Sequence, residues 1–326
     1  EDLFRVIHSL KEQGKTVIFI SHKLREVLYI CDRVTVLKQG NVVGTAEASQ
    51  TDMEKLAEMM VGRRVFYNFK RALTKVGETV LKIEGLEALD DRSVPTLRGL
   101  NLEIRESEIL GLAGVEGNGQ SELIESIMGL RKIEAGKIFL SSKDITRELT
   151  DVRIRSGISH IPEDRHKLGI VDDFNVMENI ILGGHREERF TKWGLVLDYE
   201  RAEKHSNALV KDYSVATPGI DVFIKNLSGG NQQRIVVARE FDRKPKLILA
   251  AQPTRGLDIG ATEYVRKKLL EMRDEGSAVL LISADLDEIW ALSDKIAVIY
   301  EGKIIAVRKP EETSEMELGL LMTGGR

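Results

Sequence analysis

The sequence predicts an α/β fold built on a mainly parallel β-sheet that helices cover. Short stretches of apolar and β-branched residues recur along the chain, as expected for buried strands. Between them lie longer segments whose apolar residues repeat with the period of an α-helix. Strands that alternate with helices usually form parallel sheets, because each parallel connection needs a crossover segment. Many unrelated functions use such a sheet, so the fold class alone selects none of them.

Six buried strands and five helices are expected in this alternation. The strands are residues 108–113, 137–140, 158–161, 247–250, 279–282 and 296–300. The helices are residues 120–128, 201–213, 229–241, 261–273 and 285–292. Residues 303–307 follow Glu301-Gly302 and have the pattern of a closing hairpin strand. Residues 1–10 have a helical pattern as well.

Composition and charge exclude several classes of protein. The 326 residues carry 48 Lys and Arg against 52 Asp and Glu, a net charge of −4. Nucleic-acid affinity comes mainly from basic residues that neutralise phosphates, so nucleic acid is not an expected partner. The single cysteine, Cys31, cannot form an internal disulfide and is typical of a reducing compartment. The apolar runs are much shorter than the ~20 residues that span a bilayer, and no leader pattern opens the sequence.

An internal repeat organises the chain. A shift of 262 residues aligns residues 1–64 with residues 263–326 without a gap. Among the matches are Gly14 with Gly276, Glu26 with Glu288, Gly40 with Gly302 and Arg64 with Arg326. We interpret residues 1–64 as the tail of a first domain, residues 65–79 as a linker and residues 80–326 as a complete second domain. Because Glu1 already lies in an expected helix, we interpret the chain as part of a longer protein.

A glycine-rich loop follows the expected strand at residues 108–113 and opens a helix. Its sequence is Gly114-Val115-Glu116-Gly117-Asn118-Gly119-Gln120-Ser121. This spacing matches the phosphate-binding pattern G-x-x-x-x-G-K-[ST], except that Gln120 stands at the lysine. In such loops the backbone N–H groups converge on phosphate oxygens, and the helix N-terminus favours the negative charge. A glycine-rich turn is also a common structural device, so the loop alone does not decide the function.

Two later motifs accompany this loop. The first is Leu227-Ser228-Gly229-Gly230-Asn231-Gln232, ahead of an expected helix that Ser228 can also cap. The second is Ala251-Gln252-Pro253-Thr254 after a buried strand, followed by Gly256-Leu257-Asp258. With the three motifs in this order, the chain resembles an ABC-transporter ATPase subunit over essentially its whole length. The resemblance implies a P-loop NTPase fold of the ABC nucleotide-binding type, a mainly parallel sheet with an antiparallel subdomain and a helical subdomain.

Within this family the chain resembles the tandem-domain ATPases of sugar and nucleoside importers. The segments that carry this likeness are Pro162-Glu163-Asp164-Arg165 and Gly229-Gly230-Asn231-Gln232-Gln233. Gly117-Asn118-Gly119-Gln120 together with Ala250-Ala251-Gln252-Pro253 is most similar to the nucleoside-import members. An importer of simple sugars such as ribose or galactose stays open as the alternative. A soluble tandem ATPase that acts on ribosomes or nucleic acid is disfavoured by the short linker and the net charge.

The resemblance also implies cofactors, partners and a location. The cofactors are ATP and Mg²⁺, with Ser121 as a weak magnesium ligand. The partners are integral-membrane permease subunits, and an extracytoplasmic substrate-binding protein takes part indirectly. The nucleotide-binding domains are expected to pair with one another. The protein is expected at the cytoplasmic face of the cell membrane.

The residues expected at the nucleotide come from the glycine loop and the Leu-Ser-Gly-Gly signature. They are Gly114, Glu116, Gly117, Asn118, Gly119, Gln120, Ser121, Glu122, Leu227, Ser228, Gly229, Gly230, Asn231 and Gln232. Glu163 stands where many relatives carry a glutamine that links the γ-phosphate to the membrane subunit. Residues from about 166 to 226 are expected to form the helical subdomain that docks this partner. Five of them either contact the partner or belong to the core: Phe174, Val176, Ile180, Ile181 and Trp193.

Four positions depart from what the family needs for hydrolysis. Gln120 replaces the lysine that binds the β- and γ-phosphates, and Ala251 replaces the carboxylate that orients magnesium. Gln252 replaces the glutamate that activates water, and Ala284 replaces the histidine that contacts the γ-phosphate. Residues 80–110 also contain no aromatic side chain to stack on adenine. Because phosphoryl transfer depends on positioned charge, we expect weak nucleotide binding and negligible hydrolysis here.

The first domain is expected to differ. The repeat places His22 opposite Ala284, so we expect His22 to be the γ-phosphate histidine of the first domain. In this family the domains pair head to tail, and the intact signature of the second domain would complete the ATP site of the first. We therefore expect one competent and one degenerate site in the whole protein, and no hydrolysis by this chain alone. A basic stretch, Lys143, Arg147, Arg153 and Arg155, is interpreted as a solvated helix face.

Overall fold

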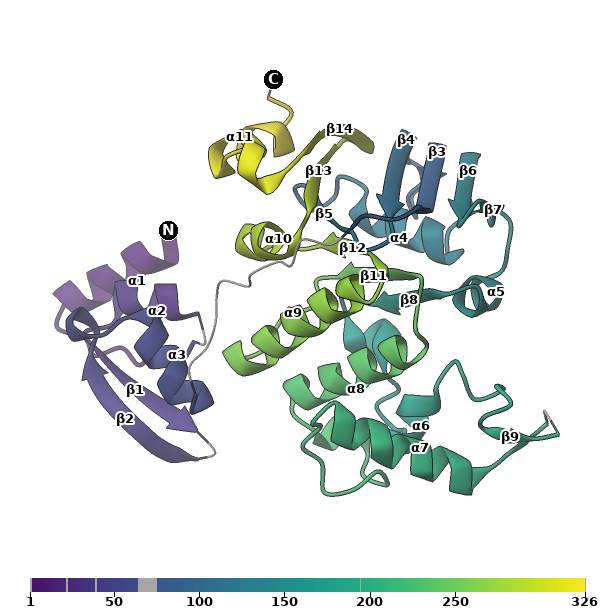
Figure 1. Cartoon of the computed structure of the whole chain (residues 1–326). Coiled ribbons are helices and arrows are strands. Elements are labelled where there is room, and N and C mark those ends of the chain that lie inside the picture. Colours follow the sequence, from purple (N-terminus) through teal and green to yellow (C-terminus); the bar gives the residue numbers. More distant parts are fainter. Residues whose placement is uncertain (1, 22, 39, 64–74, 194, 326) are drawn as a thin grey trace. The chain divides into compact units, whose positions relative to one another are not determined.

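The structure is a computed structural model that describes residues 2–21, 23–38, 40–63, 75–193 and 195–325. These residues fall into two compact units (Figure 1). The first unit contains residues 2–63 and Leu257–Tyr264, and the second contains residues 75–256 and 265–325. Helix α9 (Ile259–Asp274) is divided between them.

A six-stranded sheet forms the centre of the second unit. Its strands lie in the order β14 (Lys303–Arg308), β13 (Lys295–Tyr300), β5 (Ile109–Ala113), β12 (Ala278–Ile282), β11 (Leu247–Ala251) and β8 (Ile158–Ile161). Neighbouring strands are parallel from β13 to β8, and β14 closes the sheet as an antiparallel hairpin with β13. Every residue of β5, β11 and β12 is buried, which explains the continuous apolar runs. The predicted α/β fold is confirmed.

A second, antiparallel sheet lies beside helix α4 (Gln120–Met128), as Figure 1 shows. Its order is β4 (Pro95–Arg105), β3 (Thr79–Leu89), β6 (Ala135–Leu140) and β7 (Lys143–Asp144). Apolar side chains of β3 and β4 share one hydrophobic core with Leu123 and Ile127 of α4. The strand expected at residues 137–140 therefore belongs to this sheet and not to the parallel one. An antiparallel sheet buries one face only, so β3 and β4 alternate buried and exposed residues.

Three helices of the second unit share a separate core. They are α6 (Val176–Ile181), α7 (Tyr199–Asp212) and α8 (Gly229–Asp242). Val176, Ile180 and Ile181 are buried in this core, so they are core residues and not contacts for a partner. Phe174 and Trp193 are exposed, and Trp193 follows β9 (Thr191–Lys192), which pairs with β10 (Val196–Leu197).

The interpretation of the basic stretch as a solvated face is wrong for Arg153. This residue lies in α5 (Thr150–Arg155) and its side chain is only 2% exposed. Its guanidinium donates four hydrogen bonds of 2.7–2.9 Å to the carbonyl oxygens of Ser126, Ile127, Thr146 and Glu148. Two of these carbonyls end helix α4, where a cation also complements the helix dipole. Arg155 of the same helix is exposed and pairs with Asp151.

The first unit repeats part of the second. Helix α2 (Leu24–Ile30), strands β1 (Arg33–Lys38) and β2 (Asn41–Glu47) and helix α3 (Met53–Val61) follow α1 (Asp2–Glu12). The same order recurs 262 residues later as α10 (Leu286–Leu292), β13, β14 and α11 (Glu315–Met322). The break in strand register recurs too, between Val36 and Leu37 in one copy and between Val298 and Ile299 in the other.

One segment of the repeat has different surroundings in the two units. Ile18 and Ile20 are 88% and 92% exposed, and no strand includes them. Their counterparts at the 262-residue shift are Leu280 and Ile282, which are 0% and 6% exposed within β12. The same apolar pattern is thus covered on both sides in the second unit and open to solvent in the first.

The described part of the chain has no candidate membrane span and no cluster of metal-binding side chains. None of its helices combines the length and the hydropathy that a membrane span requires. Nor do its His, Cys, Asp and Glu side chains gather in threes at distances suited to a metal ion.

Candidate nucleotide site

The glycine loop connects β5 to α4 at the carboxyl edge of the parallel sheet. Ligands of open α/β sheets bind at this edge, where the loops after the parallel strands meet. Gly119 has φ 108° and precedes the first residue of α4. A Cβ on Gly114 would lie 2.6 Å from Ile299 of β13, so the loop packs too tightly on that strand for any side chain. These two glycines allow the sharp turn that directs the loop toward the helix.

The two amide side chains of the glycine loop donate hydrogen bonds to a backbone carbonyl of the same loop. Gln120 Nε2 and Asn118 Nδ2 each donate to the carbonyl oxygen of Val115 at 3.0 Å. The backbone N–H of Asn118 donates to the same oxygen at 3.2 Å. Gln120 thus occupies the lysine position as a neutral donor that is held against the loop, and it brings no positive charge. Glu116 is exposed in the loop and Glu122 lies in the first turn of α4, so both charged residues of the segment 114–122 are negative.

Asn118 also fastens the loop to the turn between β13 and β14. Its side-chain oxygen accepts from the backbone N–H of Glu301 at 2.8 Å, and its carbonyl accepts from that of Gly302 at 3.1 Å. The carbonyl of Gly302 in turn accepts from the backbone N–H of Arg98 in β4 at 3.1 Å. The glycine loop, the hairpin turn and the antiparallel sheet therefore form one hydrogen-bonded assembly.

The ends of β11 and β12 are joined at the positions where the sequence resemblance predicts catalytic groups. Ala251 is 8% exposed at the end of β11 and offers only a methyl group. The next residue, Gln252, has φ 47°, an uncommon backbone conformation for a residue other than glycine. Its side-chain oxygen accepts from the backbone N–H of Ala284 at 3.0 Å. The amide at the glutamate position therefore binds the loop at the histidine position and cannot serve as a base.

The residues present do not make a complete magnesium site. Mg²⁺ prefers oxygen ligands in octahedral geometry and usually takes one or two carboxylates from the protein. Ser121 is exposed and offers one hydroxyl oxygen, Ala251 offers none, and the oxygen of Gln252 is already bonded to Ala284. The glycine loop keeps the spacing of the phosphate-binding pattern, whereas Ala251 and Gln252 supply no carboxylate that would orient the metal.

The signature begins helix α8 and contacts other loops. Ser228 is the residue before the helix, but its side chain makes no capping bond to the backbone; its Oγ accepts from Asn231 Nδ2 at 3.0 Å. The side chain of Gln233 is buried and donates to the carbonyl oxygen of Pro253 at 2.8 Å. Gln232 is 5% exposed and donates to Ile224 O at 3.2 Å. In Figure 1, α8 lies with α6 and α7, well away from α4.

Glu163 lies at the same sheet edge, two residues after β8. Its carboxylate forms an ion pair with the guanidinium of Arg255, which follows Gln252 in the loop after β11. The sequence offered no sign of this partner, because 92 residues separate the two positions. The pair connects the loop expected to face the membrane subunit with the loop that holds Gln252.

A buried polar network lies between β8 and α8. Glu240 accepts from Arg239 at 2.8 Å and from the backbone N–H of His160 at 3.3 Å, and Arg243 lies 3.5 Å away. Burial acts to raise the pKa of Glu240, but the charges of Arg239 and Arg243 outweigh it and the pKa is lowered. Burial also lowers the pKa of His160 to about 4, so this ring is neutral at pH 7.

The expected residues thus form two groups. Gly114, Gln120, Gln252 and Ala284 share the carboxyl edge of the sheet, whereas Leu227–Gln232 belong to the helical part of the unit. His22 lies outside the described residues. The sequence did not predict Arg165 and Arg255 as site residues. Arg165 belongs to the Pro-Glu-Asp-Arg segment on which the family resemblance rests.

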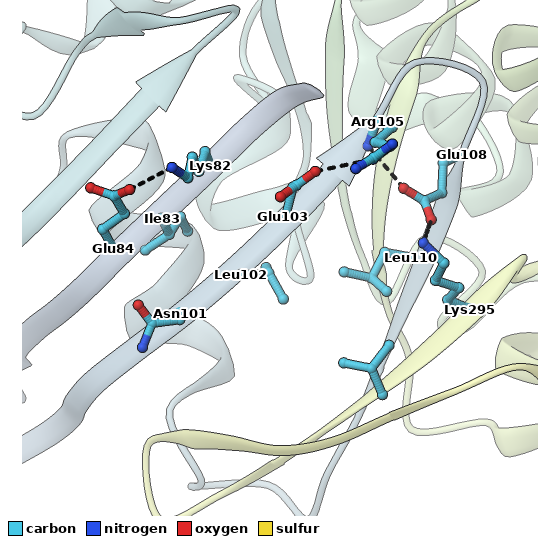
Figure 2. A pocket seen from close by; sticks show the side chains of 11 residues that line it. Lys82, Ile83, Glu84, Asn101, Leu102, Glu103, Arg105, Glu108, Leu110 and Lys295 are labelled. Atoms are coloured by element: carbon cyan, nitrogen blue, oxygen red, sulfur yellow. Dashed lines mark hydrogen bonds and ion pairs between the residues drawn. The ribbon is translucent and has the colours of Figure 1, made fainter. Parts of the chain in front are cut away.

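A surface cavity of about 510 Å³ lies at the other end of the sheet (Figure 2). It opens beside Glu108, which precedes β5, and Lys295, which begins β13, so it is remote from the glycine loop. Glu108 and Lys295 form an ion pair of 2.7 Å across it. Lys82 is paired with Glu84 at 2.6 Å, and Arg105 with Glu103 at 3.0 Å. Because these cations already have carboxylate partners, the cavity offers no ready site for an anion.

Comparisons with known proteins agree with this geometry. Residues 97–255 match the family model described as ABC transporter. The chain is 48% identical over 325 residues to the guanosine import ATP-binding protein NupO of Bacillus subtilis (strain 168), covering 99% of the chain and 63% of that protein. It is 43% identical over 324 residues to the nucleoside import ATP-binding protein NupA of Lactococcus lactis subsp. cremoris (strain MG1363), covering 99% and 64%.

Two further comparisons extend this result. The chain is 43% identical over 327 residues to the glucose import ATP-binding protein TsgD13 of Haloferax volcanii, covering 99% of the chain and 59% of that protein. The structure of a nucleotide-free ATP-binding cassette from an ABC transporter aligns with a TM-score of 0.61 at 22% identity, covering 76% of this chain and 96% of that one. This second likeness establishes the fold only. The chain spans about 60% of the length of these curated relatives. Residues 97–255 form a domain of the ABC transporter family.

Proposed function

We propose that the chain is part of the ATP-binding subunit of an importer that couples ATP binding and hydrolysis to the uptake of nucleosides. The support is the 48% and 43% identity, over 99% of the chain, to relatives named for guanosine and nucleoside import. In this role the subunit works at the cytoplasmic face of the membrane with permease subunits. A substrate-binding protein on the other side delivers the cargo.

We further propose a tandem arrangement. Residues 1–64 are the tail of a first nucleotide-binding domain, residues 65–79 are a linker, and residues 80–326 are the second domain. The 262-residue recurrence of α2, β1, β2 and α3 supports this division. The exposure of Ile18 and Ile20 supports it as well, since their counterparts in β12 are covered by strands on both sides. The first domain would supply the strands that cover them.

The second domain, in this proposal, binds nucleotide weakly and does not hydrolyse it. The observation that carries this conclusion is the hydrogen bond between Gln252 and Ala284, together with the methyl group of Ala251. An amide cannot accept the proton of an attacking water, and the loss of a positioned base commonly lowers a rate by about 10²–10⁴. The signature, Leu227–Gln232, is complete and serves the ATP site of the first domain.

Import of a simple sugar is the second candidate function. It is favoured by one observation, the 43% identity to a relative named for glucose import. Uptake assays separate the two candidates directly. Cells that express the whole transporter are given labelled guanosine or labelled glucose, and the proposal requires uptake of the nucleoside.

The division of labour between the two sites has its own test. The purified chain should show no magnesium-dependent ATPase activity above background. In the longer protein with its permease, His22→Ala should abolish transport, whereas Ala284→His should change it little. Transport that survives His22→Ala, or appreciable turnover by the purified chain, would overturn the assignment of the competent site.

A further inference from the structure

Arg165 is held at a fixed place between the sheet edge and the signature helix. It begins a short π-helical turn, Arg165–Gly169, directly after Asp164. The carboxylate of Asp164 accepts from the backbone N–H of His166 at 3.0 Å and so caps this turn. A Cβ on Gly169 would lie 3.5 Å from Val236, in ordinary contact with α8, so the turn packs on the signature helix. These contacts fix the backbone of Arg165 independently of its side chain.

The guanidinium of Arg165 contacts the signature on two sides. Its Nε donates to the side-chain oxygen of Gln232 at 3.2 Å. Its Nη2 lies where a Cβ on Gly229 would approach it to 2.6 Å, so this side chain fills the space that the glycine leaves. Its Nη1 makes a longer bond, 3.5 Å, to the carbonyl oxygen of Arg255. One side chain thus joins the signature to the loop after β11.

Two of the residues that Arg165 contacts are themselves held by further interactions. Gln232 is fixed from its other end, because its Nε2 donates to Ile224 O at 3.2 Å. Arg255 is paired with Glu163, in the loop expected to face the membrane subunit. Arg165 therefore joins the loop after β8, which also holds Glu163, to Gln232 of α8. Among the described residues, no other hydrogen bond links this loop to the first turn of α8.

Helix stability does not explain a cation at this place. The N-terminus of α8 carries the positive end of the helix dipole, which disfavours a neighbouring guanidinium. Burial opposes the charged form in addition and lowers the pKa of Arg165. An uncharged side chain would fill the same volume without either penalty. The planar fork of arginine is needed only if several acceptors at different angles must be held together.

We propose that Arg165 is a positioning residue that holds the signature in the conformation needed for ATP turnover at the neighbouring domain. This inference rests on the proposed function, since it assumes that the signature completes another site. Arg165 acts through Gln232 and Gly229, which its side chain contacts. Because misplacement of a contributing group by about 1 Å can lower a rate by about a hundredfold, loss of the contact affects turnover more than binding.

The first experiment uses this chain alone and does not depend on hydrolysis. Amide hydrogen exchange is measured for Gln232, whose N–H bonds Ser228 O at 2.9 Å, and for Ala216, whose N–H bonds Asn231 Oδ1 at 2.9 Å. In Arg165→Gln both amides should exchange about tenfold faster, because the opening of the signature costs less. Arg201→Gln removes an ion pair with Asp198 outside the signature and should leave both rates unchanged. Unchanged exchange in Arg165→Gln overturns the proposal.

The second experiment measures turnover in the longer protein that contains a complete first domain. Arg165→Gln should lower kcat for ATP at least about tenfold and leave KM unchanged. Gln232→Leu should cause the same loss, and the double variant should add little to either, as expected for one shared contact. A kcat that stays constant while exchange rises reduces Arg165 to a structural role and overturns the proposal. Absence of turnover in the unsubstituted protein overturns the proposed function itself, and the exchange result on the chain alone separates these two failures.

Discussion

The guanidinium of Arg153 donates a 2.7 Å hydrogen bond to the carbonyl oxygen of Ser126, in the last turn of the helix that follows the glycine loop. The two residues lie on different helices, α5 and α4. This contact and a second one, to the carbonyl oxygen of Ile127, close the C-terminal end of α4, and two further bonds join Arg153 to the carbonyl oxygens of Thr146 and Glu148. The helix that would direct its N-terminus at a phosphate is thus fixed from its opposite end.

Replacement of Arg153 should therefore destabilise the second unit strongly. Arg153→Met keeps the aliphatic volume but leaves four carbonyl oxygens without their donor. We expect a loss of at least about 3 kcal/mol in the free energy of unfolding. Arg155→Met, in the same helix, breaks only an exposed pair with Asp151 and should cost less than about 0.5 kcal/mol. Urea denaturation of both variants checks the prediction, and equal costs would contradict it.

The sequence predicted the alternating part of the fold because burial on both faces produces continuous apolar runs. Every residue of β11 and β12 is buried, and the expected strands there agree with the structure to within one residue at either end. Strands β3 and β4 were not predicted, since their one-sided burial leaves alternating patterns that resemble surface segments.

Side-chain contacts between distant segments were beyond the reach of sequence patterns. The sequence located Gln120, Gln252 and Ala284 as departures from the family, but not that Gln252 binds the backbone of Ala284. Arg153 was misread because its charge suggested solvent, while its partners are backbone carbonyls that no residue type reveals. The pair of Arg255 and Glu163 likewise depends on two loops that only the sheet brings together.

Restoring the charge of the glycine loop should separate binding from hydrolysis. Gln120→Lys exchanges a neutral donor for a charged one, and a charge-assisted bond to phosphate should raise the affinity for ATP about tenfold. Turnover should remain at background, because Ala251 and Gln252 are unchanged. Isothermal titration with ATP and a phosphate-release assay test the two parts. Turnover in Gln120→Lys would show that the missing lysine alone had silenced the site.

The clamp between Asn118 and the β13–β14 turn should matter for nucleotide affinity. Asn118→Ala removes the bonds to Glu301 N and Val115 O and loosens the loop before nucleotide arrives. We expect the Kd for ATP to rise about fivefold, because binding must then also order the loop. Asn101→Ala is the matched control, because Asn101 Oδ1 also accepts a backbone N–H, that of Gly85 at 3.0 Å, but far from the loop. An equal effect of both substitutions would argue against the clamp.

The low pKa of His160 predicts a loss of stability in acid. Between pH 6.5 and about 4 the unfolded chain takes up a proton at this ring and the folded chain does not. The free energy of unfolding therefore falls as the pH falls through this window, by about 2 kcal/mol after allowance for the partial exposure of the ring. His160→Gln should remove that part of the pH dependence, whereas His185→Gln, at an exposed position, should retain it. Urea midpoints at pH 7 and pH 4.5 provide the measurement.

The exposed apolar segment of the first unit gives a test of the tandem arrangement. In this chain Ile20→Lys should change the free energy of unfolding by less than about 0.5 kcal/mol, because Ile20 is 92% exposed. Ile282→Lys, at the equivalent position in β12, should cost more than about 3 kcal/mol. In a longer protein with a complete first domain, Ile20→Lys should become as costly as Ile282→Lys. If Ile20→Lys is harmless there too, the first unit does not belong to a second copy of this sheet.

The bond between Asn118 and the backbone of Glu301 joins positions that are 183 residues apart. The two partners are therefore synthesised at different times. A ribosome makes the glycine loop long before it makes the turn that fastens it. While residues 119–301 are still being synthesised, the loop has neither the partner of its side chain nor the strand on which Gly114 packs. The glycine loop can therefore reach its final structure only after the β13–β14 turn has been synthesised, and a nascent chain that stalls earlier would contain an incompletely ordered glycine loop.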